Sequence, residues 1–257
     1  MTDKPPGGIS RIAVYGRAIH KPLTHRRALV TGASRGIGAA TARALAGAGA
    51  HVALAARNRD AIDALVDELG PDHIAIAADL ATDAGVRAVV SAVEVWAAGP
   101  PDIIVNNAGE FVYGRLEDLD ADDFTRALRL NLEAPFRVVN AFLRAMRERR
   151  SGDVVTVGSV SDRSAHAGNA AYSAAKFGVR GMHEVLREES RGSGIRAILV
   201  SPGPVSTDTW APHEAELGKT FPRRESMLEP ADVARTICFA VSQPPGVNLE
   251  EVRITPS

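Results

Sequence analysis

The chain has 257 residues, of which 45% are hydrophobic and 24% charged, and its formal net charge is -1. This length suits one large α/β domain with an ample core, and the near-zero charge gives no overall electrostatic reason to expect nucleic acid or an anionic membrane as a partner. Cys238 is the single cysteine, which excludes an intrachain disulfide and a cysteine-based zinc site. No apolar run approaches the roughly 20 residues of a membrane span and no signal-peptide core precedes the first strand, so we expect a cytoplasmic protein without a metal.

Residues 1–24 show no sustained periodicity and contain the run Pro5-Pro6-Gly7-Gly8. We therefore expect a mostly flexible N-terminal extension, followed by a single domain over 25–257. No break in composition after residue 25 marks a second domain.

A glycine-rich turn follows the first expected strand, 27–31, and leads into an alanine-rich helix that reaches about Ala48. Gly32 allows a sharp turn, whereas Gly36 and Gly38 allow a pyrophosphate and the helix to approach closely, with backbone N–H groups at the helix start facing the anion. The spacing is G-x-x-x-G-x-G and not the commoner G-x-G-x-x-G. Many glycine turns are only tight connections, but this one stands between a clear strand and a clear helix, so it indicates a dinucleotide site.

The end of the second expected strand, 51–56, favours NADP(H) over NAD(H). An NAD site usually has an acid near this strand end, where it binds the ribose 2′-hydroxyl. Here the strand ends in Arg57, and Arg35 lies in the glycine turn, so two guanidiniums are available for a 2′-phosphate. The alternative is that Arg57 only starts the next helix, about 58–69, and faces solvent.

Asp79 ends the third expected strand, with Leu80 beside it. Its carboxylate could accept a hydrogen bond from an adenine amino group. It could equally cap the next helix, for which Thr82 and Asp83 are rival caps.

The fourth expected strand, 102–105, runs into Asn106-Asn107-Ala108-Gly109. Asparagines at a strand end can bond neighbouring backbone and hold the sheet open. Gly109 leaves room for a ribose or a nicotinamide.

Asn131 lies among leucines in a long helical region, about 120–149. A buried polar side chain needs a partner. Asn131 therefore either faces a water in an active site or satisfies a kink ahead of Pro135.

Tyr172 and Lys176 are four residues apart, so on a helix they share one face. A phenol has an unperturbed pKa of about 10, and a fixed ammonium nearby lowers that pKa. Each pH unit of such a shift corresponds to about 1.4 kcal/mol between the two protonation states. Ser159, at the end of a strand, could hydrogen-bond the same substrate oxygen. In isolation the pair would be read as an ordinary exposed tyrosine and a solvated lysine, but the other segments point to the same chemistry.

Three further strands are expected at 153–157, 195–200 and 252–255, with a last helix over about 230–241. Because strands alternate with helices throughout, the chain predicts a single doubly wound Rossmann-type α/β domain with about seven parallel strands and helices on both faces. Ligands bind such sheets beyond the carboxyl ends of the strands, where one crevice would collect the residues named above.

In their order and spacing these motifs resemble the short-chain dehydrogenase/reductase family, in its compact NADP-preferring branch, over about residues 26–255. The resemblance implies a seven-stranded Rossmann-type sheet, a small-molecule carbonyl or alcohol substrate, and a homodimer or homotetramer built on the long helices. The motifs are Thr31-Gly-Ala-Ser-Arg-Gly-Ile-Gly38, Asn106-Asn-Ala-Gly109, Asn131, Ser159, Tyr172-x-x-x-Lys176 and Pro202-Gly203 followed by Thr207.

The resemblance also implies a role for each of these residues. Tyr172 is the general acid/base, Lys176 lowers its pKa and binds the nicotinamide ribose, and Ser159 orients the substrate oxygen. Asn131 supports a proton-relay water. The implied cofactor contacts are Gly32, Ser34, Arg35, Gly36, Ile37 and Gly38 in the turn, Arg57, Asp79 and Leu80 around the adenosine, Asn107, Ala108, Gly109, Tyr172 and Lys176 around the second ribose, and Pro202, Gly203, Val205 and Thr207 near the carboxamide.

The sequence thus predicts an NADP(H)-dependent oxidoreductase that transfers a hydride between nicotinamide and a carbonyl or alcohol. A non-catalytic NADP(H)-binding regulator would not need the whole catalytic set, and an epimerase or dehydratase on the same fold is the other alternative. Substrate identity should depend on the loop 206–228 and on the segments after Gly109 and Ser159. Their aromatic residues either bind a partly hydrophobic substrate or only pack the loop, and they are Phe111, Tyr113, His166, Trp210 and Phe221.

Overall fold

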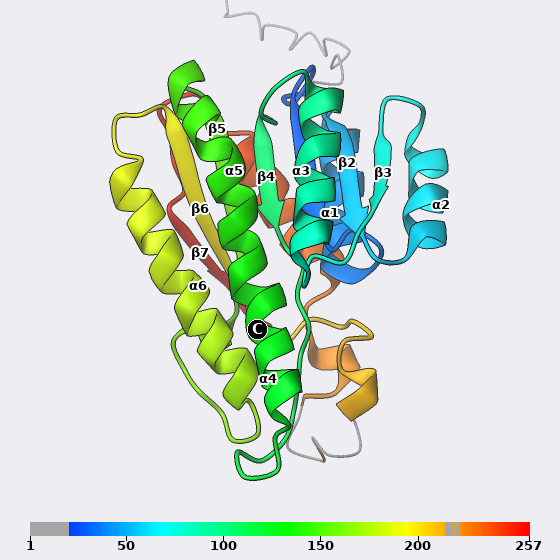
Figure 1. The fold of residues 1–257 in the computed structure, drawn as a ribbon, viewed down its shortest axis with the longest axis vertical. Coiled ribbons are helices and arrows are strands. Elements are labelled where there is room, and N and C mark those ends of the chain that lie inside the picture. The colour runs from blue at the N-terminus through cyan, green and yellow to red at the C-terminus, as the bar shows by residue number, and fades with distance from the viewer. Residues whose placement is uncertain (1–20, 214–217, 219–221) are drawn as a thin grey trace, which may run out of the picture.

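The computed structural model describes residues 21–213, 218 and 222–257, and Figure 1 shows them as one sheet with helices on both sides. Seven strands form the sheet in the order β3-β2-β1-β4-β5-β6-β7, and all neighbours are parallel. This confirms the expected doubly wound Rossmann-type fold. The strands are β1 Arg27–Thr31, β2 His51–Ala56, β3 Ile74–Ala77, β4 Ile103–Asn106, β5 Gly152–Val157, β6 Ile195–Pro202 and β7 Glu251–Ile254.

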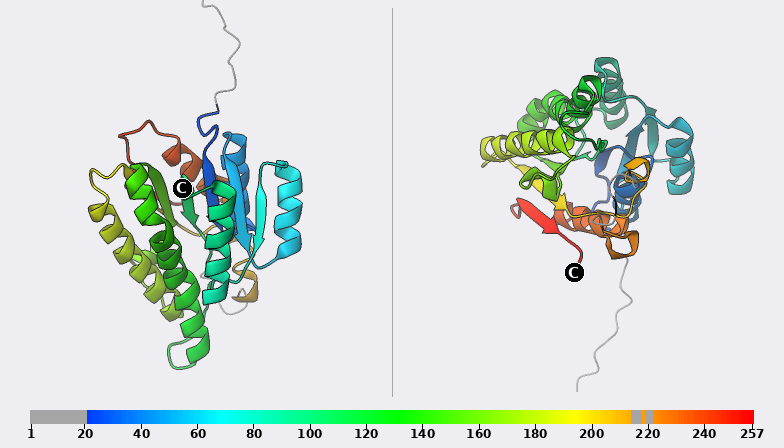
Figure 2. Two further views of the ribbon diagram at one scale, coloured as in Figure 1. Left: turned by 45° about the horizontal axis from the view of Figure 1, so that its top comes forward. Right: turned by 90° about the horizontal axis from the view of Figure 1, so that it is seen from below.

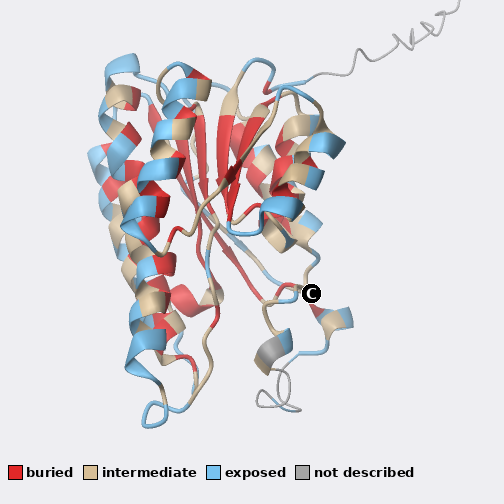
Figure 3. Ribbon diagram, turned by 45° about the vertical axis from the view of Figure 1, so that its right-hand side comes forward, coloured by how far each residue is buried: buried red, intermediate tan, exposed pale blue. Residues whose placement is uncertain are grey.

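Helices cover both faces of the sheet, as the two views of Figure 2 show. One face carries α1 Gly36–Gly47, α2 Arg59–Leu69 and α8 Pro230–Val241, and the other carries α3 Asp83–Ala97, α5 Ala134–Arg149 and α6 Ala170–Glu189. Because both faces are covered, the strands are apolar on both sides. On β1, for example, Val30 belongs to the core under α1 and Leu29 to the core under α3. Figure 3 shows that burial is concentrated in the strands and on the helix sides that face them.

Side-chain caps fix where several helices begin. The carbonyl oxygen of the Asn58 side chain accepts from the N–H of Ala61 at the start of α2, and Thr82 Oγ1 accepts from the N–H of Gly85 at the start of α3. Asp120 accepts from two backbone N–H groups at the start of α4, Ala121–Leu128. Each such cap satisfies a donor that the helix itself leaves unpaired and contributes about 1 kcal/mol.

The long helical region expected over 120–149 is interrupted by one wide turn. A π-helical turn, Arg129–Glu133, joins α4 to α5 and contains Asn131. Pro135 has no N–H to donate to the carbonyl of Asn131, four residues earlier, so a regular α-helical hydrogen bond cannot form there. The helix is therefore irregular ahead of Pro135, in the form of a π turn.

The segment before β1 packs against the domain. Residues 1–20 of the expected extension lie outside the described residues. Within the remainder, Leu23 is buried and its N–H donates to the carbonyl of Ala48 at 3.0 Å. Residues 21–24 therefore contact the body of the domain.

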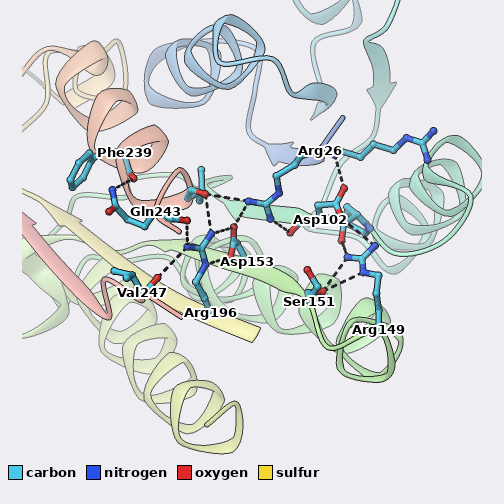
Figure 4. A network of polar contacts seen from close by, with 12 residues as sticks. Arg26, Asp102, Arg149, Ser151, Asp153, Arg196, Phe239, Gln243 and Val247 are labelled. Atoms are coloured by element: carbon cyan, nitrogen blue, oxygen red, sulfur yellow. Dashed lines mark hydrogen bonds and ion pairs between the residues drawn. The ribbon is translucent and has the colours of Figure 1, made fainter. Parts of the chain in front are cut away.

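At the amino ends of the strands, a charge network ties four strands together (Figure 4). Asp153 of β5 is buried and pairs with Arg196 of β6 at 2.5 Å and with Arg26, next to β1, at 2.8 Å. Arg26 also donates to the carbonyl of Asp102, next to β4, at 3.1 Å. The two guanidiniums compensate the buried carboxylate, which would otherwise be costly.

The two ends of the loop expected over 206–228 are held together by backbone pairing. Its ends pair through the isolated bridge between Val205 and Leu228, and it contains short 3-10 turns at Ala211–His213 and Arg224–Ser226. Among the described helices, none is both long enough and apolar enough to cross a membrane.

Candidate active site

A cavity of about 820 Å³ opens at the carboxyl ends of the strands, near the lower end of the sheet in Figure 1. Every site residue expected from the sequence lines it except Gly38, which is buried behind the turn. The expected crevice therefore exists, with the volume of a small-molecule or cofactor site. The lining residues predicted from sequence are Gly32, Ser34, Arg35, Gly36, Ile37, Arg57, Asp79, Leu80, Asn107, Ala108, Gly109, Asn131, Ser159, Tyr172, Lys176, Pro202, Gly203, Val205 and Thr207.

The glycine turn has the shape of an anion cradle. Gly32 and Gly36 have φ of 67° and 54°, in the left-handed region that other residues rarely adopt. At Gly38 a Cβ would overlap the carbonyl oxygen of Gly32 and lie 2.6 Å from Asn107 Nδ2. Helix α1 has no side-chain cap, so its first N–H groups remain available to a bound anion.

Asn107 and Thr31 join the glycine turn to the end of β4. Asn107 Nδ2 donates to the carbonyl of Thr31 at 2.9 Å, and Thr31 Oγ1 accepts from the N–H groups of Asn107 and Ala108 at 3.0 Å each. The asparagine thus bonds neighbouring backbone, as expected for a residue at this strand end. The contacts hold β1 and β4 at a fixed separation where the cavity begins.

Asp79 does not cap helix α3, because Thr82 does. Its Oδ1 accepts from the N–H of Ala81 at 3.0 Å, and its Oδ2 lies 3.7 Å from Arg126 Nη1. The half-buried carboxylate lines the cavity beside Leu80, which is buried. Of the two roles left open by the sequence, the capping role is wrong.

Arg35 and Arg57 are exposed and both line the cavity. Within the part of the chain that the structure describes, neither guanidinium forms an ion pair. Helix α2 begins at Arg59, and Asn58 caps it. The segment between β2 and α2 therefore holds Arg57 and Asn58, and it lacks the acid that is usual in an NAD site. Two cations without a protein partner at this edge suit a phosphate group better than a hydroxyl.

Ser159, Tyr172 and Lys176 meet between the end of β5 and helix α6. The Ser159 side chain lies close enough to Tyr172 to lower the pKa of its phenol, and Lys176 Nζ lies 5.5 Å from the Tyr172 ring centroid. Lys176 is buried and donates to the carbonyl of Val157 at 2.9 Å. The end of β5 and the helix α6 therefore bring Ser159 close to Tyr172 and Lys176, which share one face of the helix.

The expected lowering of the Tyr172 pKa by Lys176 stays a prediction, because burial dominates the pKa of the phenol in this structure. Burial raises the pKa of Tyr172 to about 12, the hydrogen bond with Ser159 opposes that rise, and the charge of Asp162 adds to it. Burial also lowers the pKa of Lys176 to about 8, against the opposing effect of Asp162. In both groups the removal of water disfavours the charged form, and this is the largest influence on each pKa.

Asn131 presents an unpaired acceptor next to Gly109. Its Nδ2 donates to the carbonyls of Glu110 and Ala127, both at 3.0 Å. Its Oδ1 is buried without a partner among the described residues, and a Cβ on Gly109 would lie 2.5 Å from it. A buried polar atom of this kind is usually satisfied by an ordered water or a ligand, which suits a water position beside the cavity.

Aromatic rings form one wall of the cavity around Phe111. The Phe111 ring centroid lies 4.8 Å from that of Trp210, 5.2 Å from Tyr172 and 5.6 Å from His213. Trp210 Nε1 donates to the carbonyl of Val205 at 2.7 Å, which fixes the indole. Tyr113 and His166 also line the cavity, whereas Phe221 lies outside the described residues.

Sequence reasoning missed Asp162, which is fully buried directly behind Ser159. The signal was present in the sequence, because Ser159-x-x-Asp162 has the spacing of a capping box, and this box closes the turn Val160–Asp162.

Among residues 21–213, 218 and 222–257, no group of three His, Cys, Asp or Glu side chains could hold a metal ion.

Comparison with known proteins gives a consistent set of relatives. The family model described as short chain dehydrogenase matches residues 26–218. The glycine betaine reductase of Emericella nidulans is 35% identical over 241 residues, which are 91% of this chain but span only 19% of that protein's length. An uncharacterized oxidoreductase of Staphylococcus aureus is 30% identical over 91% of this chain and 98% of its own length.

A solved structure with a similar fold comes from the same family. A metagenomic short-chain oxidoreductase in complex with NADP superimposes with a TM-score of 0.79 at 31% identity. The match covers 92% of this chain and 99% of that one.

Proposed function

The chain belongs to the short-chain dehydrogenase family and is an NAD(P)-dependent oxidoreductase, and we propose that it transfers a hydride between NADP(H) and a carbonyl or alcohol with Tyr172 as general acid/base. The observation that carries the proposal is the meeting of Ser159, Tyr172 and Lys176 at the cavity that begins at the glycine turn. The nicotinamide supplies the hydride chemistry, and the protein handles the proton and the orientation.

The glycine turn and the open start of α1 fit a pyrophosphate. Arg35 and Arg57 fit a 2′-phosphate, and the NADP complex of the similar metagenomic enzyme supports the same preference. We therefore propose NADP(H) as the cofactor and NAD(H) as the weaker ligand. Asp79 and Leu80 would flank the adenine, and Val205 and Thr207 would contact the carboxamide.

In the proposed reaction Ser159 and Tyr172 hold the substrate oxygen by hydrogen bonds. With a pKa of about 12, Tyr172 is protonated at neutral pH and can donate its proton to the oxygen during carbonyl reduction. Lys176, held on the carbonyl of Val157, places its ammonium behind the phenol and would contact the nicotinamide ribose. The unpaired Oδ1 of Asn131 supports a water through which the proton is replaced.

The aromatic wall favours a substrate with apolar or aromatic groups beside the carbonyl. Phe111 and Trp210 line the same cavity as Tyr172, and the described residues of this wall include no lysine or arginine. A neutral, apolar carbonyl would bury its surface there without leaving a charge unpaired.

We also propose that the protein assembles as a homodimer or homotetramer through the long helices. Phe136 of α5 and Phe177 of α6 are 49% and 46% exposed, so the two long helices offer large apolar side chains that a second copy of the chain could cover. Light scattering after size exclusion measures the assembly directly. A monomer at all concentrations would contradict it.

The central experiment follows NADPH oxidation by absorbance with a panel of carbonyls that includes benzaldehyde, 4-carboxybenzaldehyde and cyclohexanone. We expect turnover with at least one neutral member and a loss of turnover by about 10²-fold or more in Tyr172→Phe, with NADPH binding retained. Tyr113→Phe is the matched control: it removes the other phenol hydroxyl that lines the cavity but keeps the ring, so it should lose much less turnover than Tyr172→Phe. Full activity in Tyr172→Phe would remove the acid/base assignment, and an epimerase or dehydratase would show turnover without net NADPH oxidation.

A further inference from the structure

A buried carboxylate lies directly behind the proposed reaction centre. Asp162 is 0% exposed and ends the short 3-10 turn that begins after Ser159. A buried carboxylate is costly unless it is both paired and hydrogen-bonded. The contacts of Asp162 therefore indicate what holds it there and what it holds.

Asp162 joins three separate elements of the site. Its Oδ2 accepts from the N–H of Ser159 at 3.3 Å and from Ser201 Oγ, at the end of β6, at 2.5 Å. Its Oδ1 accepts from Arg163 Nε at 2.8 Å and lies 3.7 Å from Arg180 Nη1 on α6. One carboxylate thus fixes the Ser159 turn against both β6 and α6.

The backbone ahead of Ser159 is shaped around this carboxylate. A Cβ on Gly158 would lie 2.5 Å from Asp162 Oδ2 and 2.8 Å from Ser201 Oγ. A larger residue at position 158 would have to displace the Asp162 or the Ser201 side chain. The glycine therefore leaves room for Asp162 and Ser201 to meet beneath the strand end.

Helix α6 carries Tyr172, Lys176 and Arg180 at intervals of four residues, so the three side chains follow one face of the helix. Arg180 lies against Asp162, and Lys176 is the next side chain along that face. The negative charge of Asp162 acts on both other members, because it raises the pKa of Lys176 and of Tyr172. It opposes the effect of burial on Lys176 and adds to that effect on Tyr172.

We propose that Asp162 is a positioning residue of the reaction centre, which fixes the Ser159 turn and provides the buried negative charge that stabilises the Lys176 ammonium. The catalytic roles of Ser159 and Lys176 rest on the proposed function, whereas the effect of the Asp162 charge on the Lys176 ammonium does not. Asp162 acts through Ser159 and Lys176 and need not touch the substrate.

Other charged or titratable groups surround this centre and have to be considered in any titration. They are Arg163 at the turn, Arg180 on α6, Glu251 on β7, Glu110 and Tyr113 after β4, and His166 and His213 in the loops. Of the carboxylates, Asp162 is the one that bonds the Ser159 backbone. Glu251 pairs with Arg163 at 2.6 Å on the outer side of the same network.

The test measures the titration of Lys176 in the full chain by the ¹³C chemical shift of its ε-carbon, with Lys176→Met used to assign the signal. The midpoint in the unmodified protein is expected at about 8. Asp162→Asn keeps the shape of the side chain and removes its charge, so the midpoint should fall by about one pH unit. Glu251→Gln removes a carboxylate from the same network and should leave the midpoint unchanged.

A purely structural Asp162 would leave the Lys176 midpoint unmoved in Asp162→Asn, and that result overturns the proposal. An equal fall in Glu251→Gln would also overturn it, because the effect would then belong to the whole network. If Asp162→Asn does not fold, as judged by circular dichroism, Arg163→Gln replaces it. That variant keeps the carboxylate and removes its nearest counter-charge, so the midpoint should rise, and an unchanged midpoint contradicts the proposal.

Kinetics separate this inference from the proposed function. With whichever carbonyl of the panel is reduced, Asp162→Asn should lower kcat by about 10-fold and change the NADPH affinity much less, because the Ser159 turn and the Lys176 ammonium are perturbed while the glycine turn is not. An unchanged kcat contradicts the positioning role. If the unmodified protein reduces no carbonyl, the proposed function fails, and the Lys176 titration still decides the role of Asp162.

Discussion

Lys176 Nζ donates to the main-chain carbonyl of Val157 at 2.9 Å, in a place where the lysine side chain is 6% exposed. The carbonyl belongs to the last residue of β5, two positions before Ser159. This hydrogen bond thus links the strand that leads into Ser159 to the helix that carries Tyr172.

We expect Lys176→Met to lower kcat by about 10²-fold or more, because Tyr172 loses the ammonium behind it and α6 loses its bond to β5. The melting temperature should change little, since the variant leaves a buried carbonyl unpaired but also removes a costly buried charge. Steady-state kinetics and thermal denaturation measure the two effects. A kcat within a factor of about two of the unmodified enzyme would contradict the role of Lys176.

Arg57→Ala should weaken NADPH binding by about 10-fold or more and leave NADH binding nearly unchanged, because only NADPH carries the 2′-phosphate. Thermal stabilisation by each cofactor, measured in parallel, ranks the affinities. Arg59→Ala is the matched control: Arg59 is exposed in the same segment but pairs with Asp63 at 3.6 Å and does not line the cavity. Equal losses for the two cofactors in Arg57→Ala would remove the case for a phosphate site.

Two glycines of the same helix should respond oppositely to alanine. At Gly38 a Cβ would overlap backbone atoms of Gly32, so Gly38→Ala should abolish or strongly weaken cofactor binding or folding. At Gly47 a Cβ would meet nothing within 4 Å, so Gly47→Ala should raise the free energy of unfolding by up to about 1 kcal/mol through helix propensity. Denaturant unfolding and cofactor titration test both. Cofactor binding by Gly38→Ala at normal affinity would contradict the close approach of turn and helix.

Stability should fall at acid pH because of one buried histidine. His183 is 1% exposed, its Nδ1 lies 2.9 Å from Thr156 Oγ1, and burial, with help from Arg187, lowers its pKa from 6.5 to about 4. The unfolded chain therefore binds a proton at a higher pH than the folded chain does. The stability that the neutral ring contributes is present above pH 6.5 and is lost as the pH falls through 4.

This difference corresponds to about 3 kcal/mol of unfolding free energy between neutral pH and pH values below the folded pKa. Denaturant unfolding across that range measures it. His183→Gln should reduce the fall of the unfolding free energy at acid pH, whereas His166→Gln, at an exposed position, should leave that fall unaltered. An identical fall in the unmodified protein and in His183→Gln would show that another group is responsible.

Much of the site could be predicted because its motifs are local. The glycine turn depends on residues within one strand–helix connection, and Tyr172 and Lys176 share a helix face by their spacing alone. The alternation of strands and helices then predicts a parallel sheet whose carboxyl ends collect these segments. Arg35 and Arg57 could be placed at the same edge of the cavity by this rule, although they are far apart in the chain.

The sequence by itself determined the sheet, the cavity and the residues around it, because periodicity and short spacings act over a few residues. The tertiary structure alone decided that Thr82, and not Asp79, caps α3. It alone also shows that Asn131 Oδ1, beside Gly109, has no partner among the described residues. It also decided the direction of the Tyr172 pKa, since burial is a property of every element packed around the phenol. The contact between Asp162 and Ser201 joins residues 39 positions apart, and no local pattern encodes a hydrogen bond that forms only when β5, β6 and α6 have come together.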